Sequence, residues 1–329
     1  MEVFYPNYYE KFVCIAAKCP DSCCKEWSVD VDEVSAAYYR SLPGPLGDRL
    51  RSVLEDTEGG TIMVIENGRC PMWRKDGLCE IQAQLGHDAL CKVCREFPRL
   101  RHDYGDFVEL GLELSCPEAA RLILTQPKQN MVAQTVPGGE APEYDTEIMA
   151  ILRRTRKEFL DFLESTTLPF PQILKIFLLY IYDVQTELDG GELAVLSPDV
   201  TIAGVTGSAD AQPLLNFFLG LEILTPQWKT RLESPTDSPR WIPQHKALLH
   251  YFIQRYWLQA VSDYDILCRG KFAIAACLLI GFLGGDLVET AQLFSKEIEN
   301  DPDNVEAILN GSHTALALTD RYFLELLAR

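Results

Sequence analysis

The feature that most constrains this chain is the crowding of nine of its eleven cysteines into the first 116 residues. The N-terminal sequence, MEVFYPNYYEKF, has neither the basic start nor the apolar run of a secretory signal. We therefore expect a cytoplasmic protein, whose thiols stay reduced and rarely form disulfides. Thiols at this density in a reducing compartment predict metal ligation. The nine positions are Cys14, Cys19, Cys23, Cys24, Cys70, Cys79, Cys91, Cys94 and Cys116.

The spacing of these cysteines bears on the kind of metal. Thiolates are soft ligands that select zinc, copper(I) or iron–sulfur clusters. A zinc ribbon usually brings two Cys-x2-Cys pairs, and only Cys91 and Cys94 have that spacing. The looser spacing elsewhere favours an iron–sulfur centre, with zinc as the alternative, although it matches neither ferredoxin signature. Nine cysteines can form one four-thiolate site with spares, or two sites.

Other metal-ligand residue types are sparse. Cys268 and Cys277 lie in an apolar helical segment and are expected to act as buried packing residues. His87 and His102 flank the Cys91–Cys94 pair, but thiols are already plentiful there. No two histidines have helical spacing, which excludes an H-E-x-x-H hydrolase.

Charge and hydropathy exclude two classes of partner. The net charge of −18, with no compensating Lys/Arg run, argues against nucleic-acid binding. The longest apolar run, Phe272 to Gly285, is shorter than the roughly 20 residues that span a bilayer. This run predicts a buried helix, and no membrane association is expected.

The pattern along the chain predicts a mainly α protein in two parts. Residues 1–127 form a cysteine-rich metal-binding domain, with strands at 27–32, 61–71 and 107–115 and helices at 33–42, 80–97 and 117–124. Residues 128–145 are rich in Pro, Gly and polar residues, as in a linker. Residues 146–329 form a helical bundle, because apolar residues recur there at helical spacing. Its segments are 146–166, 171–188, 211–224, 245–261, 271–283, 286–300 and 304–328.

A small basic patch lies beside the last cysteines. Arg95, Arg99 and Arg101 can balance the negative charge of thiolate ligands, or they can hold the carboxylate of a small-molecule substrate or cofactor. Charge balance is the favoured interpretation, because nearby cations lower the cost of thiolates. Arg95 and Arg99 are the candidates for cofactor binding.

Four blocks of sequence resemble the signature blocks of the bacterial flagellin lysine-N-methylase family, whose cysteine cluster is described as a zinc- or iron-chelating domain. They are YYEKFVCIAAKCPDSCCKEWSVDVD, ENGRCPMWRKDGLCEIQAQLG, LCKVCREFPR and LELSCPEAARLIL, and QLFSKEIENDPDNVEAIL resembles the closing helices more faintly. The resemblance implies methyl transfer from S-adenosylmethionine to lysines of flagellin, with a [4Fe–4S] cluster. The metal ligands it implies are Cys14, Cys19, Cys23, Cys24, Cys70, Cys79, Cys94 and Cys116, with Cys91 as a further candidate.

Two functional hypotheses follow from this resemblance and the cysteine pattern. The first is an S-adenosylmethionine-dependent lysine N-methyltransferase that acts on flagellin or another lysine-bearing protein. The second is a non-enzymatic iron- or zinc-binding module whose helical half docks another protein. The chain lacks the Cys-x3-Cys-x2-Cys triplet of radical S-adenosylmethionine enzymes, because Cys24 directly follows Cys23. The sequence assigns no catalytic base and no oligomeric state.

Overall fold

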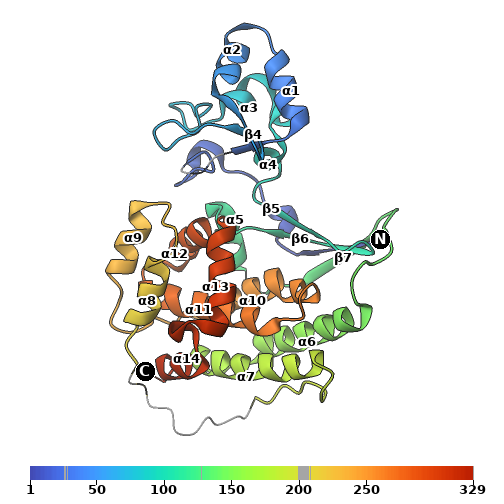
Figure 1. The fold of residues 1–329 in the computed structure, drawn as a ribbon, viewed down its shortest axis with the longest axis vertical. Helices are drawn as coiled ribbons and strands as arrows, with labels where there is room; N and C mark the ends of the chain where they lie inside the picture. The colour runs from blue at the N-terminus through green and yellow to red at the C-terminus, as the bar shows by residue number, and fades with distance from the viewer. Residues whose placement is uncertain (26, 28, 127, 199–206, 208, 329) are drawn as a thin grey trace.

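The fold consists of a small N-terminal lobe above a larger, mostly helical body (Figure 1). The computed structural model describes residues 1–329 except 26, 28, 127, 199–206, 208 and 329. Helix dominates the described part of the chain, which contains fourteen α-helices and two small sheets. The prediction of a mainly α protein is confirmed.

The larger body includes a four-stranded sheet built from residues 2–6 and from three strands between residues 99 and 135. Its order is β5-β6-β1-β7, formed by Arg99–Asp103, Phe107–Leu112, Glu2–Pro6 and Met131–Thr135. Strand β1 pairs parallel with β6 and antiparallel with β7. Only β6 was predicted. Strand β7 lies inside the predicted linker, while the domain boundaries themselves stay a prediction.

The small lobe combines a three-stranded sheet with four short helices. The sheet order is β2-β4-β3, and the elements are β2 (Val29–Val31), β3 (Leu54–Thr57), β4 (Gly60–Met63), α1 (Glu33–Ser41), α2 (Gly44–Val53), α3 (Glu80–Leu85) and α4 (Lys92–Glu96). The single helix predicted over 80–97 is wrong. Gly86 has a φ of 89°, which ends α3, and a 3-10 turn separates it from α4.

The remaining helices form the body and largely follow the predicted segments. They are α5 (Pro117–Thr125), α6 (Thr146–Ser165), α7 (Phe170–Leu188), α8 (Gln212–Leu219), α9 (Pro226–Glu233), α10 (His245–Tyr256), α11 (Ile266–Leu283), α12 (Leu287–Phe294), α13 (Pro302–Thr314) and α14 (Asp320–Leu326). Helix α9 was missed, and its polar composition hides the buried Trp228 and Leu232. A π-helical turn, Ser295–Glu299, extends α12.

Helix α11 is the centre of the body and contacts α7, α10, α12 and α13. It is the one helix in the described part that is long and apolar enough to cross a membrane, but 94% of that window is buried inside the protein. The Asp265 side chain caps its first turn, and Gly284, at a φ of 58°, follows its last residue. Cys277 is fully buried within it. The apolar run is therefore accounted for by packing.

Two separate hydrophobic cores reflect this arrangement. The small lobe has its own core around Tyr39, Leu50 and Met63, which also contains Cys70 and Cys91. The larger core joins the four-stranded sheet and α5 to the helices of the body. Residues on both sides of the predicted boundary thus contribute to the larger core.

Candidate metal centre

The cysteines occupy the ends of elements and the loops between them. Cys79, Cys91 and Cys116 are the N-cap residues of α3, α4 and α5, and Cys94 lies within α4. Cys70 follows β4 after an Asn67–Gly68 turn, in which both residues have positive φ. Cys14, Cys19, Cys23 and Cys24 lie in the chain before β2. The cysteines thus lie at the termini of several elements and in the loops beside them.

Backbone contacts fix several of these cysteines next to one another. The Cys70 N–H donates to the Cys24 carbonyl at 2.8 Å, which places the 23–24 loop against the segment after β4. The Asp32 carboxylate accepts from the Lys92 N–H at 2.8 Å, which attaches the start of α4 to the start of α1. The Tyr39 hydroxyl donates to the Ala89 carbonyl at 2.7 Å. These hydrogen bonds hold the segment that contains Cys91 and Cys94 against the core of the small lobe.

Two groups of thiols lie close enough to change one another's pKa values. The Cys23 and Cys70 side chains hydrogen-bond to Cys24, which lowers the pKa of Cys24 and raises the pKa values of Cys23 and Cys70. In the same way, the bond between Cys94 and Cys91 lowers the pKa of Cys91 and raises that of Cys94. Each group therefore already holds one sulfur that favours the thiolate, the form that binds metal.

The two groups and the remaining thiols form one connected set. Cys94 is close enough to Cys23 and Cys24 for their charges to raise its pKa. Cys79 lies near Cys24 and Cys91. Burial, with smaller contributions from Cys19 and Cys14, raises the pKa of Cys116 to about 11. Each of the nine predicted thiols thus lies near at least one other. A soft cation could replace their protons, so the chemistry of the donor set fits a thiolate-bound metal.

The helical body contacts this region through Asp21, which lies between Cys19 and Cys23. The Lys296 ammonium and the Gln292 amide lie 3.0 and 3.2 Å from Oδ2 of Asp21. Gln292 also donates to the Ser115 carbonyl at 2.8 Å, directly before Cys116. The side chains of α12 and the π-helical turn therefore orient two cysteine-bearing segments at once.

Each arginine of the predicted basic patch already has a partner within the protein. The Arg95 guanidinium donates to the Leu90 carbonyl at 3.4 Å, and the Arg99 guanidinium lies 5.1 Å from the centre of the Phe12 ring. Arg101 pairs with Asp103 at 2.6 Å. A role for Arg95 and Arg99 in cofactor binding stays a prediction.

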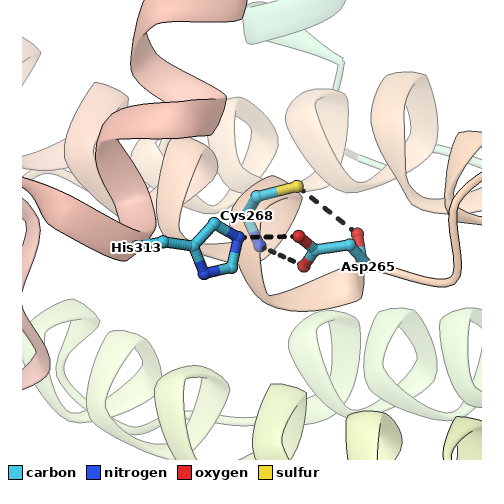
Figure 2. A group of neighbouring side chains, drawn as sticks. All are labelled: Asp265, Cys268 and His313. Carbon is cyan, nitrogen blue, oxygen red and sulfur yellow. Dashed lines mark hydrogen bonds and ion pairs between the residues drawn. The ribbon is translucent and has the colours of Figure 1, made fainter.

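A second donor group lies in the body, where Asp265, Cys268 and His313 meet (Figure 2). It is the one set of three such residues in the described part of the chain whose ligand atoms all lie within 4.8 Å of one another. His313 Nε2 and Asp265 Oδ2 are 2.7 Å apart, while the other oxygen of Asp265 caps α11. Burial raises the pKa of Cys268 to about 12. The group joins α11 to the end of α13, a partnership hidden in the sequence because His313 lies far from Asp265.

Comparison with known proteins places the chain among bacterial relatives. It is 30% identical over 135 residues to the flagellar biosynthetic protein FliU of Salmonella muenchen, a match that covers 37% of this chain and 76% of that protein. It is 31% identical over 132 residues to the lysine-N-methylase of Salmonella typhimurium. The chain belongs to the flagellin lysine-N-methylase family. The match spans 32% of the length of the Salmonella typhimurium family member.

Two further comparisons returned nothing. No protein-family model matches the chain. No solved structure matches it either.

Proposed function

We propose that this protein is a cytoplasmic, S-adenosylmethionine-dependent protein-lysine N-methyltransferase, with a flagellin-type substrate and a cysteine-ligated [4Fe–4S] cluster. The proposed activity is supported by the similarity of this chain to proteins named lysine-N-methylase, at 31% identity over 132 residues. Because that match covers only 37% of the chain, the substrate is the first element to test.

The spread of the thiols supports a cluster over a single zinc ion. Ligands of one ion lie close together, whereas the thiolates of a four-iron cluster bind different iron atoms and lie farther apart. Among the described residues, the only three donors with ligand atoms within 4.8 Å of one another are in the body, away from the nine cysteines. The residues that would hold the cluster are drawn from the nine, with Cys23, Cys24, Cys70, Cys91 and Cys94 the most tightly interconnected.

The proposed reaction is a displacement at a methyl carbon. The lysine ε-amine must first lose its proton, because an ammonium has no electron pair to donate. The bond from the sulfonium sulfur to the methyl group then breaks as the bond from nitrogen to that methyl group forms, and S-adenosylhomocysteine leaves. Such a transfer requires the amine and the methyl group to be aligned at near-attack distance. No described residue is assigned as the base.

The methyltransferase proposal is tested with anaerobically purified full-length protein, S-adenosylmethionine labelled at its methyl group, and purified flagellin. We expect label on flagellin lysines by peptide mass spectrometry, and detectable binding of S-adenosylmethionine by calorimetry. A matched reaction contains bovine serum albumin in place of flagellin. Absence of binding at millimolar S-adenosylmethionine would exclude the enzyme and leave a metal-binding module.

The cluster proposal has its own measurement. Visible absorption together with iron and acid-labile sulfide analysis should show a brown protein with iron and sulfide in equal amounts. A colourless protein that holds zinc would replace the cluster with a zinc site, without affecting the assay of methyl transfer.

A further inference from the structure

A cavity of about 780 Å³ lies in the body, away from the small lobe. Its walls come from β1, β6, the end of α5, the segment leading into β7 and its first residue, one face of α6, and α10 with the two residues before it. Its volume lies within the range of about 300–1,000 Å³ that is typical of small-molecule sites. None of the nine N-terminal cysteines lines it.

The lining of this cavity is positively charged, although the chain as a whole carries −18. Five cationic side chains line it, against the three carboxylates of Glu109, Asp161 and Glu164. These carboxylates are paired with Arg156, Lys157 and Lys128 respectively. The other two cations are Arg153 and Lys246. A local excess of positive charge in an acidic protein selects for an anionic ligand.

Arg153 is the cation best placed to bind an external anion. Its guanidinium lies 5.2 Å from the ring centre of Phe4 and 4.7 Å from that of Phe107. Stacking on two rings holds the group in place, while the N–H donors at its edge remain available. Within the described residues, Arg153 has no carboxylate partner. Lys246, by contrast, already donates to the Thr166 carbonyl.

Two buried polar atoms of the lining also lack a partner. They are Nδ1 of His250 and Oε1 of Gln129, whose amide nitrogen donates to the Ile123 carbonyl at 2.7 Å. Burial, followed by the charge of Arg156, lowers the pKa of His250 to about 4, so the ring is neutral at pH 7. A buried polar atom without a partner is costly, and a ligand can satisfy it.

Apolar side chains form part of the remaining wall. Leu124, Met131, Leu160 and Leu163 line the cavity from three different elements. These side chains suit the hydrocarbon or aromatic part of a ligand, since small-molecule sites are mostly apolar with a few placed polar groups.

We propose that this cavity binds a small organic anion, with its carboxylate or phosphate on Arg153, hydrogen bonds to His250 and Gln129, and its apolar part against the leucines. This proposal does not depend on methyl transfer. S-adenosylmethionine fits the cavity poorly, because its sulfonium and ammonium outweigh its single carboxylate and make it a net cation.

The test uses 8-anilinonaphthalene-1-sulfonate, an anion with an apolar body, titrated by fluorescence into the full-length protein. We expect one saturable site in the wild type, and at least a tenfold weaker Kd in Arg153→Ala, since a charge-assisted hydrogen bond is lost. Arg153→Lys keeps the positive charge, and its affinity for the probe should fall less than that of Arg153→Ala. Arg321→Ala, an exposed arginine on α14 outside the cavity, is the matched control and should bind as the wild type does.

Competition identifies the acid group. Displacement of the probe by octanoate assigns a carboxylate ligand, and displacement by adenosine monophosphate assigns a phosphate ligand. Either result supports the proposal when Arg153→Ala also weakens the probe. Equal affinity in wild type and Arg153→Ala, absence of a saturable site, or displacement by S-adenosylmethionine but by neither anion would overturn it. Thermal unfolding of each variant verifies that a loss of binding is not a loss of fold.

Discussion

The ammonium of Lys296 lies 3.0 Å from Oδ2 of Asp21, so a residue of the C-terminal body is ion-paired to the loop between Cys19 and Cys23. The Lys296 side chain is 3% exposed, and its ammonium also lies 5.2 Å from the centre of the Trp27 ring. An ion pair held away from water with an aromatic neighbour resists screening by salt. The two parts of the molecule are thus joined at the candidate metal centre itself.

Replacing Lys296 by Met should release the cysteine loop. We expect a loss of about 1–3 kcal/mol of stability, because Asp21 then keeps a partly buried charge without its main partner. Metal should dissociate faster in the presence of a chelator, as followed by absorption. Lys229→Met, which removes an exposed pair with Glu233, is the control and should change neither quantity. Equal chelation rates in all three proteins would contradict the coupling.

The same ion pair predicts sensitivity to acid. Burial raises the pKa of Asp21, but the Lys296 ammonium and hydrogen-bond donors lower it further, and the net pKa lies below the ordinary 3.8. A carboxylate with a depressed folded pKa stabilises the fold above its unfolded pKa, and this contribution is lost as the pH falls through the folded value. Unfolding measured from pH 6 to pH 3 should show a smaller acid loss in Lys296→Met than in the wild type.

Metal content should separate the N-terminal cysteines from those of the body. Cys70→Ser and Cys94→Ser are expected to lower bound metal and to destabilise the small lobe, because metal-binding free energy contributes to its folding. Cys277→Ser should leave metal content unchanged and cost about 1–3 kcal/mol for a polar group in the core. Metal analysis and thermal unfolding measure both effects. Wild-type metal content in the two N-terminal variants would refute a thiolate centre.

The buried pair of Glu109 and Arg156 should be far more important for stability than the partly exposed pair of Glu118 and Arg121. Glu109 and Arg156 are 6% and 8% exposed. Glu109→Ala leaves the arginine charge buried, and we expect a loss of about 3–5 kcal/mol in urea unfolding. Glu118→Ala removes a pair in which the arginine side chain is 54% exposed, and should cost less than about 1 kcal/mol.

Buried histidines should make the body unstable in mild acid. Burial lowers the pKa of His245 to about 4, below its unfolded value near 6.5. The unfolded chain then binds a proton more readily, so stability present above pH 6.5 is lost as the pH falls toward 4. NMR should show a neutral His245 ring at pH 5.5. His245→Gln should flatten the pH dependence of unfolding, and an unchanged slope would contradict this assignment.

The helices of the body were predictable because their apolar residues recur at regular spacing. Strands that pair with distant segments were not predictable from local patterns. The segments over 146–166 and 171–188 repeat apolar residues every three or four positions, and they fold as α6 and α7. Strand β1 was not predicted, because its sequence, EVFYP, has no clear alternation. Its partners in the sheet, β6 and β7, lie far along the chain. The break at Gly86 depends on a local φ of 89° that an otherwise helical pattern conceals.

The nine cysteines could be proposed as a candidate centre from the sequence, but their surroundings could not be predicted. Cysteine density alone indicated the nine positions, because so many thiols in a short segment are hard to explain by packing. The partner of Asp21 was not predictable, since Lys296 lies on a π-helical turn at the other end of the chain. Such contacts depend on how the helices of the body pack, and they cannot be predicted from a local sequence pattern.

The pairing of β1 with β6 and β7 sets an order of events on the ribosome. Glu2 pairs with Phe107 and Thr135, so β1 waits for partners that are made more than a hundred residues later. At about 5–20 residues per second, that delay lasts roughly 5–30 seconds. During this time the cysteines of the nascent chain have emerged without the sheet beneath them. Their exposure to oxidants and to competing metal ions is therefore greatest before β6 and β7 have emerged.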